Sequence, residues 1–341
     1  MTEFCMIKLS TGMPMGPSTI DDAINGFLDT VRLGRSKNTY ETYFFALQAF
    51  RDLLRGREID AAAPASTLTE DAISWFAVFL KHQSPATEQL YLQAAKSFYK
   101  YLAAERLAPI NLPRLDLLKQ QRARRPGVRL PQFPASDIER LLEHVGTKEF
   151  VGAGDEAEQL RALRDRAFIL TLADTGLRVH EACQLRRGQI DWNEGRALIV
   201  GKGNKQAVVR FSTRSLRALK AYLARRAPLD GAAGKSLAAL PLFARHDKGA
   251  GSKIKPITTS TGRLIVELRA SQALGEAADQ RITPHSLRHF FVTAVLRGSG
   301  NLKLAQELAR HASIQVTQRY AHLSNDELDR GYHEIFEDQS R

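Results

Sequence analysis

The N-terminal third of the chain repeats apolar residues at the three- and four-residue spacing of amphipathic helices. Four such stretches follow one another, separated by short polar turns. We predict that Ser18 caps the first helix, that Thr69 caps the third, and that Ser84, followed by Pro85, begins the fourth. The apolar faces predict a four-helix bundle over residues 18–107, with the aromatic side chains in its core.

Beyond this bundle the spacing of apolar residues changes twice. Ser136 is a predicted helix cap with Glu139 at the capping-box position, and Gly176 is a predicted helix end. Apolar and polar residues then alternate, which predicts three short strands at 189–191, 197–200 and 206–211. Helical spacing returns over 213–226, 260–274, 284–297, 302–309, 314–322 and 325–336. These elements predict a mainly α fold with a small antiparallel β-sheet, an α+β arrangement.

Residues 108–134, between the two regions, have the composition of a connector. Five prolines interrupt helices there, and six side chains are positively charged. Such a strap could run across a DNA duplex and gain affinity by releasing counterions, with Arg122, Arg124 and Arg125 as candidate phosphate contacts. A flexible charged linker between domains is the alternative. The sequence thus predicts a tail at 1–17, a helical domain at 18–107, the connector, and a second domain at 135–338.

Charge and cysteine content narrow the class of protein. The 341 residues suffice for about two domains, and 49 Lys and Arg against 37 Asp and Glu give a net charge of +12, with the excess beginning at residue 114. This distribution favours a polyanionic partner, although a solvated basic surface explains it equally well. Cys5 and Cys183 form no CxxC pair. With neither a signal-peptide pattern nor an apolar run of roughly 18 residues, we expect a cytoplasmic protein without a membrane span.

Five side chains in the C-terminal half carry the chemistry that we expect of the protein. They are Arg178, His285, Arg288, His311 and Tyr320. The first follows the turn at Gly176 and begins a helix, where backbone amides also favour anions. Pro284 at a first helical position places the next histidine and arginine three residues apart on one helix face. Two guanidinium groups, two imidazoles and a phenol can hold a phosphodiester and attack it without a metal.

Three further residues lie close to this set in the predicted fold. Glu181 is one helical turn from Arg178. It orients either that arginine or a neighbouring imidazole, or it forms an ordinary helix pair. Lys202 and Lys205 flank the turn between the second and third strands. A lysine at a hairpin tip is usually solvated, but beside a phosphate-binding arginine it can donate a proton to a leaving alkoxide.

Four sequence boxes occur in an order that resembles the tyrosine recombinases, the phage integrase and Xer-type family. The boxes are TGLRVHE at 175–181, GKGNK at 201–205, HSLRH at 285–289 and HASIQVTQRYAH at 311–322. The N-terminal bundle resembles the core-binding domain of this family, so that the resemblance extends over about residues 18–338 and implies a tyrosine-recombinase catalytic domain after the connector. One departure is Arg310, which stands where the family usually has glycine.

The resemblance implies a site-specific DNA recombinase that cleaves and rejoins strands through a covalent 3′-phosphotyrosine. Tyr320 would attack the scissile phosphate and Lys202 would protonate the leaving 5′ oxygen, without ATP, cofactor or metal. Arg178 and Arg288 would stabilise the transition state through the non-bridging oxygens.

Other residues of the boxes would assist this reaction. His311 would add a hydrogen bond to the phosphate, and His285 would help to accept the tyrosine proton. Glu181 would support the site without touching the reacting groups. Lys205 would contact DNA, although either lysine of the hairpin remains a candidate for the general acid.

The resemblance also implies partners. These would be double-stranded DNA recombination sites, on which a homotetramer would assemble from protein that is monomeric when free in solution. An accessory protein or a paralogous recombinase could join the assembly. The segment 325–338 would dock onto a neighbouring protomer or pack in cis. We expect the protein at the nucleoid in the cytoplasm.

Two other functions remain open from the sequence. A type IB topoisomerase relaxes DNA as a monomer with similar residues, and a regulator or architectural factor binds DNA without cleaving it. A non-cleaving factor would have no need of Tyr320. A recombinase could serve integration and excision of a mobile element or the resolution of DNA dimers.

Overall fold

The structure of the protein is a computed structural model, and it describes seven ranges of the chain. The described residues are 18–124, 134–152, 154–200, 206–247, 254–275, 282–311 and 313–318. The chain separates into two compact units, Met1–Val128 and Arg129–Arg341. Each unit has its own cluster of buried apolar side chains. Of the helices in the described ranges, none combines the length and the apolar character needed to cross a bilayer.

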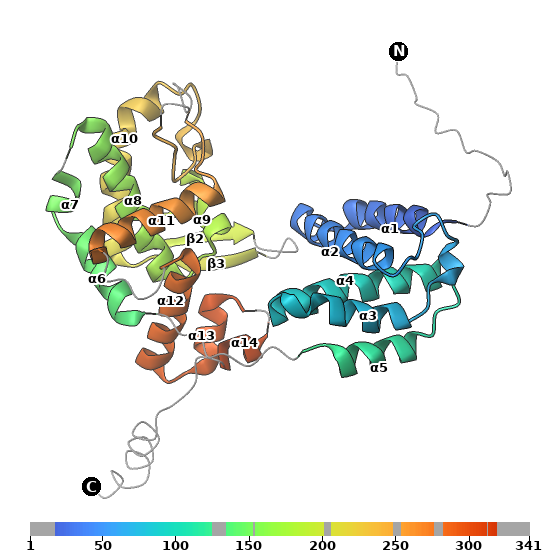
Figure 1. The fold of residues 1–341 in the computed structure, drawn as a ribbon. Coiled ribbons are helices and arrows are strands. Elements are labelled where there is room, and N and C mark those ends of the chain that lie inside the picture. The colour runs from blue at the N-terminus through green and yellow to red at the C-terminus, as the bar shows by residue number, and fades with distance from the viewer. Residues whose placement is uncertain are drawn as a thin grey trace, which may run out of the picture. The chain divides into compact units, whose positions relative to one another are not determined.

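The N-terminal unit consists of helices packed around an aromatic core. The helices are α1 (Ile20–Gly34), α2 (Lys37–Arg55), α3 (Asp71–Phe79), α4 (Pro85–Ala104) and α5 (Leu112–Arg122). The first four are the predicted helices, and α1 and α2 lie side by side above α3 and α4 in Figure 1. Phe27, Phe50, Phe76 and Phe98 are buried between them, and the Phe50 and Phe76 rings meet edge to face at 5.2 Å. These four aromatic residues are therefore core side chains as predicted, whereas Phe45 is 60% exposed.

Helix caps in this unit agree with the sequence at one of three positions. Ser84 caps α4 as predicted and accepts a hydrogen bond from the Thr87 amide. Thr19, not Ser18, caps α1, and Glu70, not Thr69, precedes α3. These errors are of one residue each, because neighbouring polar residues compete for the cap and the path of the incoming chain decides between them.

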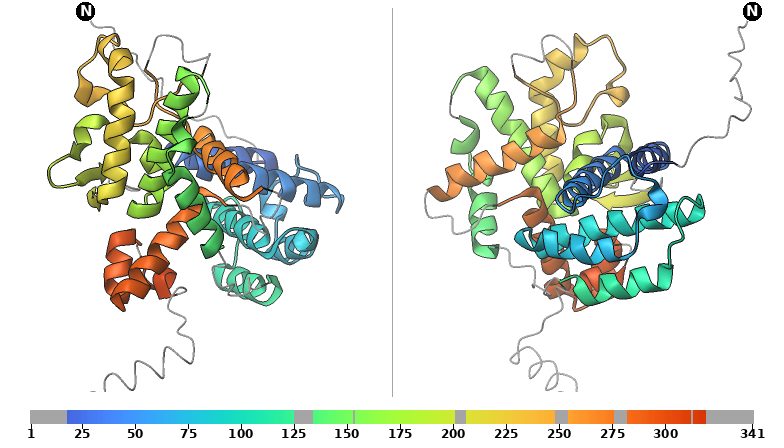
Figure 2. Two further views of the ribbon diagram at one scale, coloured as in Figure 1. Left: turned by 90° about the vertical axis from the view of Figure 1, so that its left-hand side faces the viewer. Right: turned by 45° about the vertical axis from the view of Figure 1, so that its right-hand side comes forward.

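The predicted connector contains a helix, so the expectation that its prolines exclude helical structure is wrong for residues 112–122. Pro113 lies in the first turn of α5, where a missing backbone N–H removes no helical hydrogen bond, and Asn111 caps the helix. Helix α5 packs on α3 and α4, on the side away from α1 and α2 in both Figure 1 and Figure 2. This part of the connector thus belongs to the N-terminal unit.

The C-terminal unit is also mostly helical. Its helices are α6 (Ala135–Gly146), α7 (Glu149–Gly152), α8 (Glu156–Thr175), α9 (Val179–Gln184), α10 (Thr213–Gly231), α11 (Thr259–Leu274), α12 (Pro284–Ser299), α13 (Leu302–Ala309) and α14 (Ile314–Gln318). Helix α8 is buried along most of its length and packs against α10, α11 and α12. Helices α12, α13 and α14 gather at one end of this unit (orange to red in Figure 1).

A three-stranded antiparallel sheet completes the unit and confirms the predicted fold class. Its strands are β1 (Ile190–Asp191), β2 (Arg196–Val200) and β3 (Gln206–Arg210), in the order β1-β2-β3. Leu198 pairs with Val208 across β2 and β3. The tip of this hairpin, residues 201–205, lies outside the described residues.

Two predicted helix boundaries in this unit have different outcomes. Helix α6 begins after Pro134 without a side-chain cap, so the predicted Ser136 cap is wrong. Helix α8 ends at Gly176 as predicted, with a left-handed φ of 60°. A Cβ atom at Gly176 would lie 2.4 Å from the Phe291 ring of α12. Glycine therefore permits both the turn and the close approach of α12 to it.

Candidate active site

The turn that ends α8 places Arg178 at the start of α9. The Arg178 amide donates a hydrogen bond to Glu181 Oε2 at 2.8 Å, and its Nη1 donates to Glu181 Oε1 at 2.9 Å. The Glu181 side chain is buried, whereas that of Arg178 is 42% exposed. Of the two roles open for Glu181, this geometry matches orientation of Arg178, because both carboxylate oxygens bind the same residue.

Helix α12 brings a second arginine to the same turn. Thr283 and Ser286 form a capping box around the predicted first-turn Pro284. Arg288, one turn further, is buried. Its Nη1 donates to the Gly176 carbonyl, and its Nη2 donates to the Ala309 carbonyl at the end of α13. The Arg288 guanidinium thus joins the end of α8 to the end of α13.

A pocket of about 490 Å³ opens beside these two arginines. Its lining includes Arg178, His285 and Arg288 of the predicted set, together with Arg263 and Glu267 of α11. The structure therefore brings three predicted residues to one concave surface, from two segments more than a hundred positions apart. Such a pocket, with two guanidinium groups in its wall, suits an anionic ligand.

His311 follows α13, and both its backbone amide and its ring have hydrogen-bond partners. Its amide donates to the Gln306 carbonyl at 3.1 Å, and its Nδ1 lies 2.8 Å from the buried hydroxyl of Thr317 in α14. Thr317 is three positions before Tyr320 in the sequence. Sequence reasoning did not assign a role to Thr317, because a threonine inside a short helix gives no signal of its own.

The imidazoles near the arginines are easier to deprotonate than usual. Partial burial and then the charges of Arg288 and Arg178 lower the pKa of His285. Burial, followed by Arg288, Arg178, Arg310 and His285, lowers the pKa of His311 to about 4. Both rings are therefore neutral near pH 7, and a neutral imidazole can accept a proton or donate its single N–H proton.

Glu181 remains ionised although it is buried. Burial alone would raise the pKa of this carboxyl, but the hydrogen bonds from Arg178 and the charges of Arg310 and Arg178 together hold the pKa below its usual value. Arg310 Nη2 donates to Glu181 Oε2 at 3.1 Å. The sequence identified Arg310 only as a departure from the glycine of similar proteins, and its contact with Glu181, 129 positions away, could not be anticipated.

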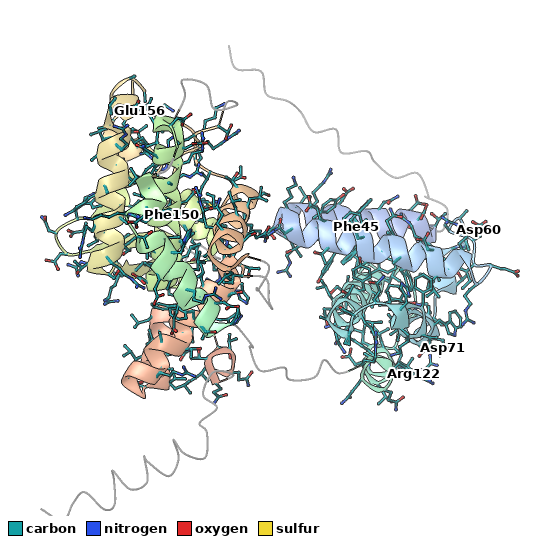
Figure 3. The ribbon with its side chains drawn as sticks, turned by 60° about the vertical axis from the view of Figure 1, so that its left-hand side comes forward. Phe45, Asp60, Asp71, Arg122, Phe150 and Glu156 are labelled. Atoms are coloured by element: carbon teal, nitrogen blue, oxygen red, sulfur yellow. The ribbon has the colours of Figure 1, made fainter. Side chains whose placement is uncertain are left out.

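Several other predicted site residues either have a different environment from the one expected or lie outside the described residues. Lys202, Lys205, Tyr320 and Arg125 are outside the described residues. Arg122 is exposed at the outer surface of the N-terminal unit (Figure 3), where a phosphate could reach it. Arg124 instead turns inward, and its Nε donates to the buried carboxylate of Glu88 at 2.5 Å. Arg124 is thus part of the contact that fastens the end of α5 to α4.

Known proteins match both the sequence and the fold. The sequence profile of the Phage integrase family matches residues 132–327. Tyrosine recombinase XerC of Myxococcus xanthus is 31% identical over 249 residues, which cover 73% of this chain and 75% of that protein. Tyrosine recombinase XerD of Mycobacterium tuberculosis is 31% identical over 310 residues, which cover 87% of this chain and 91% of that protein.

Solved structures show the same fold at lower identity. A post-cleavage complex of the XerH site-specific recombinase with palindromic difH substrate has a TM-score of 0.69 at 18% identity, covering 94% of this chain and 97% of that one. A lambda integrase dimer bound to a core site has a TM-score of 0.61 at 16% identity, covering 89% and 95%. The match to the family over more than half of the sequence, with relatives above 30% identity, places this chain in the phage integrase family of tyrosine recombinases, which cleave and rejoin DNA strands.

Proposed function

We propose that this chain is a site-specific recombinase whose active site is built from six residues. They are Arg178, Lys202, His285, Arg288, His311 and Tyr320. The observation that carries the proposal is the pocket in which Arg178, His285 and Arg288 meet. A phosphodiester that enters this pocket would meet two guanidinium groups and a neutral imidazole, which are the groups needed to bind it and to accept a proton.

The proposed reaction is a transesterification at phosphorus. The Tyr320 oxygen attacks the scissile phosphate and loses its proton, for which His285 is the acceptor. The bond from phosphorus to the 5′ oxygen breaks, and Lys202 gives that oxygen a proton. Attack by the 5′-hydroxyl of another strand reverses these steps and releases the tyrosine, so that the energy of the phosphodiester is retained.

Arg178, Arg288 and His311 have the proposed task of stabilising the transition state. Charge accumulates on the non-bridging oxygens when phosphorus becomes five-coordinate, and fixed donors stabilise that charge without reorganising. The contacts of Arg178 with Glu181 and of Arg288 with two backbone carbonyls support this role, because they hold the guanidinium groups in place. In the tautomer we propose for His311, Nδ1 accepts a hydrogen bond from the Thr317 hydroxyl, and Nε2–H is directed to phosphate.

The proposed partner is double-stranded DNA carrying a recombination site. Support comes from the related XerH and lambda integrase structures, each of which contains its DNA site. A homotetramer on DNA, assembled from monomers, is proposed for this chain, and a paralogous partner is a natural extension because relatives occur under the names XerC and XerD. Docking of segment 325–338, which lies outside the described residues, belongs to the same proposal. The place of action would be the nucleoid in the cytoplasm.

The experiment that tests the proposal is to trap covalent protein–DNA adducts in the host and to sequence the attached DNA. A recombinase should yield one sequence, or a small related set, with breaks at fixed positions. Adducts scattered over many sequences would favour a topoisomerase. The absence of any adduct, with retained DNA binding, would favour a non-cleaving regulator.

A further inference from the structure

Arg310 occupies a backbone conformation that does not suit it. It ends α13 with φ 56° and ψ 45°, in the left-handed region that glycine adopts without steric cost. A glycine would form the turn before His311 more easily. The backbone turn alone would favour glycine at this position. A reason for arginine must therefore come from the contacts of its side chain.

The Arg310 side chain reaches the partners of both proposed phosphate-binding arginines. It is only 11% exposed, and its Nη2 lies 3.1 Å from Glu181 Oε2 and 3.3 Å from the Gly176 carbonyl oxygen. Glu181 is the carboxylate that orients Arg178, and the Gly176 carbonyl also accepts a hydrogen bond from Arg288. Arg310 is thus linked to each of these arginines through one shared acceptor.

The positive charges in this cluster outnumber the negative ones. One carboxylate, Glu181, faces the guanidinium groups of both Arg178 and Arg310. Burial lowers the pKa of Arg310, the charge of Glu181 opposes that effect, and the charge of Arg178 adds to it. Within the described residues, the buried Nε and Nη1 of Arg310 have no hydrogen-bond partner, so that Glu181 is its principal stabilising contact.

This inequality has a consequence for Arg178. If Glu181 faced Arg178 alone, a full negative charge would oppose the binding of an anion beside that guanidinium. With Arg310 on the other side of the carboxylate, the three groups together keep a net positive charge. Opposite charges a few ångströms away influence ion binding strongly at partly buried sites.

We propose that Arg310 is a positioning residue that acts through Glu181: it fixes the carboxylate that orients Arg178 and offsets its negative charge, so that Arg178 binds phosphate more strongly. The inference deepens the proposed function, and it rests on that function only for the identity of the ligand as a DNA phosphate. Arg310 itself is not placed in contact with the phosphate.

The test measures the binding of inorganic phosphate to the full-length, DNA-free protein at constant ionic strength. Binding is followed through the ring signals of ¹³C-labelled His285 and His311, which lie near the arginines. The variants are Arg310→Gly, Arg310→Lys, Glu181→Gln and the double variant Arg310→Gly/Glu181→Gln. Thermal melting of each variant reports whether it is folded, and Arg310→Lys keeps the charge should the glycine variant fold poorly.

Arg106 offers a matched control. It also has a left-handed φ of 56°, and it follows α4 in the other unit. Arg106→Gly therefore removes one positive charge and relieves the same backbone conformation without touching Glu181. We expect Arg106→Gly to bind phosphate as the unaltered protein does.

We expect Arg310→Gly to weaken phosphate binding by about threefold or more, and Arg310→Lys to recover part of the loss. In the Glu181→Gln background the same glycine substitution should have a smaller effect, because the positioning exerted through the carboxylate is gone and only the loss of one positive charge remains. Unchanged binding by Arg310→Gly would overturn the inference. So would an equal loss in both backgrounds, since Arg310 would then act independently of Glu181.

The result of the phosphate titration can be distinguished from the result of the test of the proposed function. Phosphate binding needs no cleavage, whereas the proposed recombinase must form a covalent adduct. Once its DNA site is known, a slower single-turnover cleavage by Arg310→Gly at saturating DNA, rescued in part by Arg310→Lys, would agree with the inference. A chain that forms no adduct would defeat the proposed function and leave the phosphate titration to decide the role of Arg310.

Discussion

Arg288 donates a hydrogen bond to the backbone carbonyl of Gly176, which lies 112 positions earlier in the chain. This bond fixes the buried guanidinium against the turn that carries Arg178. Removing Arg288 would therefore remove both a proposed phosphate ligand and a contact between distant segments. Arg178 is different, because its side chain is 42% exposed and its hydrogen bonds go to the neighbouring turn of α9.

We expect Arg178→Ala to lower the rate of DNA cleavage by roughly 100- to 1,000-fold, with a much smaller loss of DNA affinity. Arg288→Ala should show a similar loss of rate and should also lower the free energy of unfolding by roughly 2–3 kcal/mol, because the buried carbonyls of Gly176 and Ala309 each lose a donor. Single-turnover cleavage, gel-shift titration and urea unfolding measure the three quantities. Equal losses of rate and affinity in Arg178→Ala would indicate a simple phosphate anchor.

The general acid can be identified with a modified substrate. Lys202→Ala should cleave normal DNA slowly, because the leaving 5′ oxygen needs a proton. A 5′-bridging phosphorothiolate has a leaving sulfur that needs none, so it should restore cleavage by this variant. Lys205→Ala is the matched control and should gain nothing comparable. Rescue of Lys205→Ala instead would assign the proton transfer to Lys205.

The pKa of His311 gives a prediction for the DNA-free protein. Its ring should titrate near pH 4, compared with 6.5 for an unperturbed histidine, because burial and the charges of Arg288, Arg178 and Arg310 disfavour the cation. Removing a nearby cation with Arg310→Gly should raise this pKa. Titration of the ¹³C-labelled ring, assigned with His311→Gln, checks both statements, and a midpoint near 6.5 would contradict the first.

The same shift affects stability. Between pH 6.5 and about 4 the unfolded chain binds a proton at His311 that the folded chain does not, so this residue lowers the free energy of unfolding as the pH falls through that range. Above pH 6.5 it has no such effect. His311→Gln should therefore reduce the fall in stability over this range, as measured by urea unfolding at several pH values.

The sequence assigned Arg122, Arg124 and Arg125 to DNA contact, but the pairing of Arg124 with Glu88 gives Arg124 a structural role. Arg124→Ala should lower the free energy of unfolding of the N-terminal unit by roughly 1–3 kcal/mol, because the buried carboxylate loses a partner. Arg122→Ala removes an exposed cation and should affect DNA affinity and its salt dependence instead. Unfolding followed through Trp75, in a Trp192→Phe background, reports on this unit alone. Equal stability of the two variants would contradict the assignment.

The sequence predicts much of this fold because the regular elements have strong local signals. Apolar spacing identifies most of the helices of both units, and alternation identifies the three strands. Gly176 marks a helix end, and Pro284 marks a helix start, which predicts that His285 and Arg288 lie on one helix face. Helix α5 was missed because a proline in a first helical turn and a proline that breaks a helix look alike when the end of the helix is unknown.

The contacts that join distant segments could not be predicted in the same way. Nothing near Arg124 in the sequence indicates that Glu88, 36 positions earlier, accepts its hydrogen bonds. Arg310 is visible in the sequence as an unusual residue, but its contact with Glu181 depends on how α13 packs beside the turn after α8. Such pairs arise from the tertiary fold, and local spacing carries no information about them.

The proposed chemistry is tested most directly by identifying the amino acid that becomes attached to DNA. Trapped adducts would be digested with protease and nuclease, and the modified peptide would be sequenced by mass spectrometry. We predict a nucleotide joined through its 3′ phosphate to Tyr320, and no adduct from Tyr320→Phe, which should still bind DNA. A modification on another residue, or an adduct formed by Tyr320→Phe, would contradict the proposed mechanism.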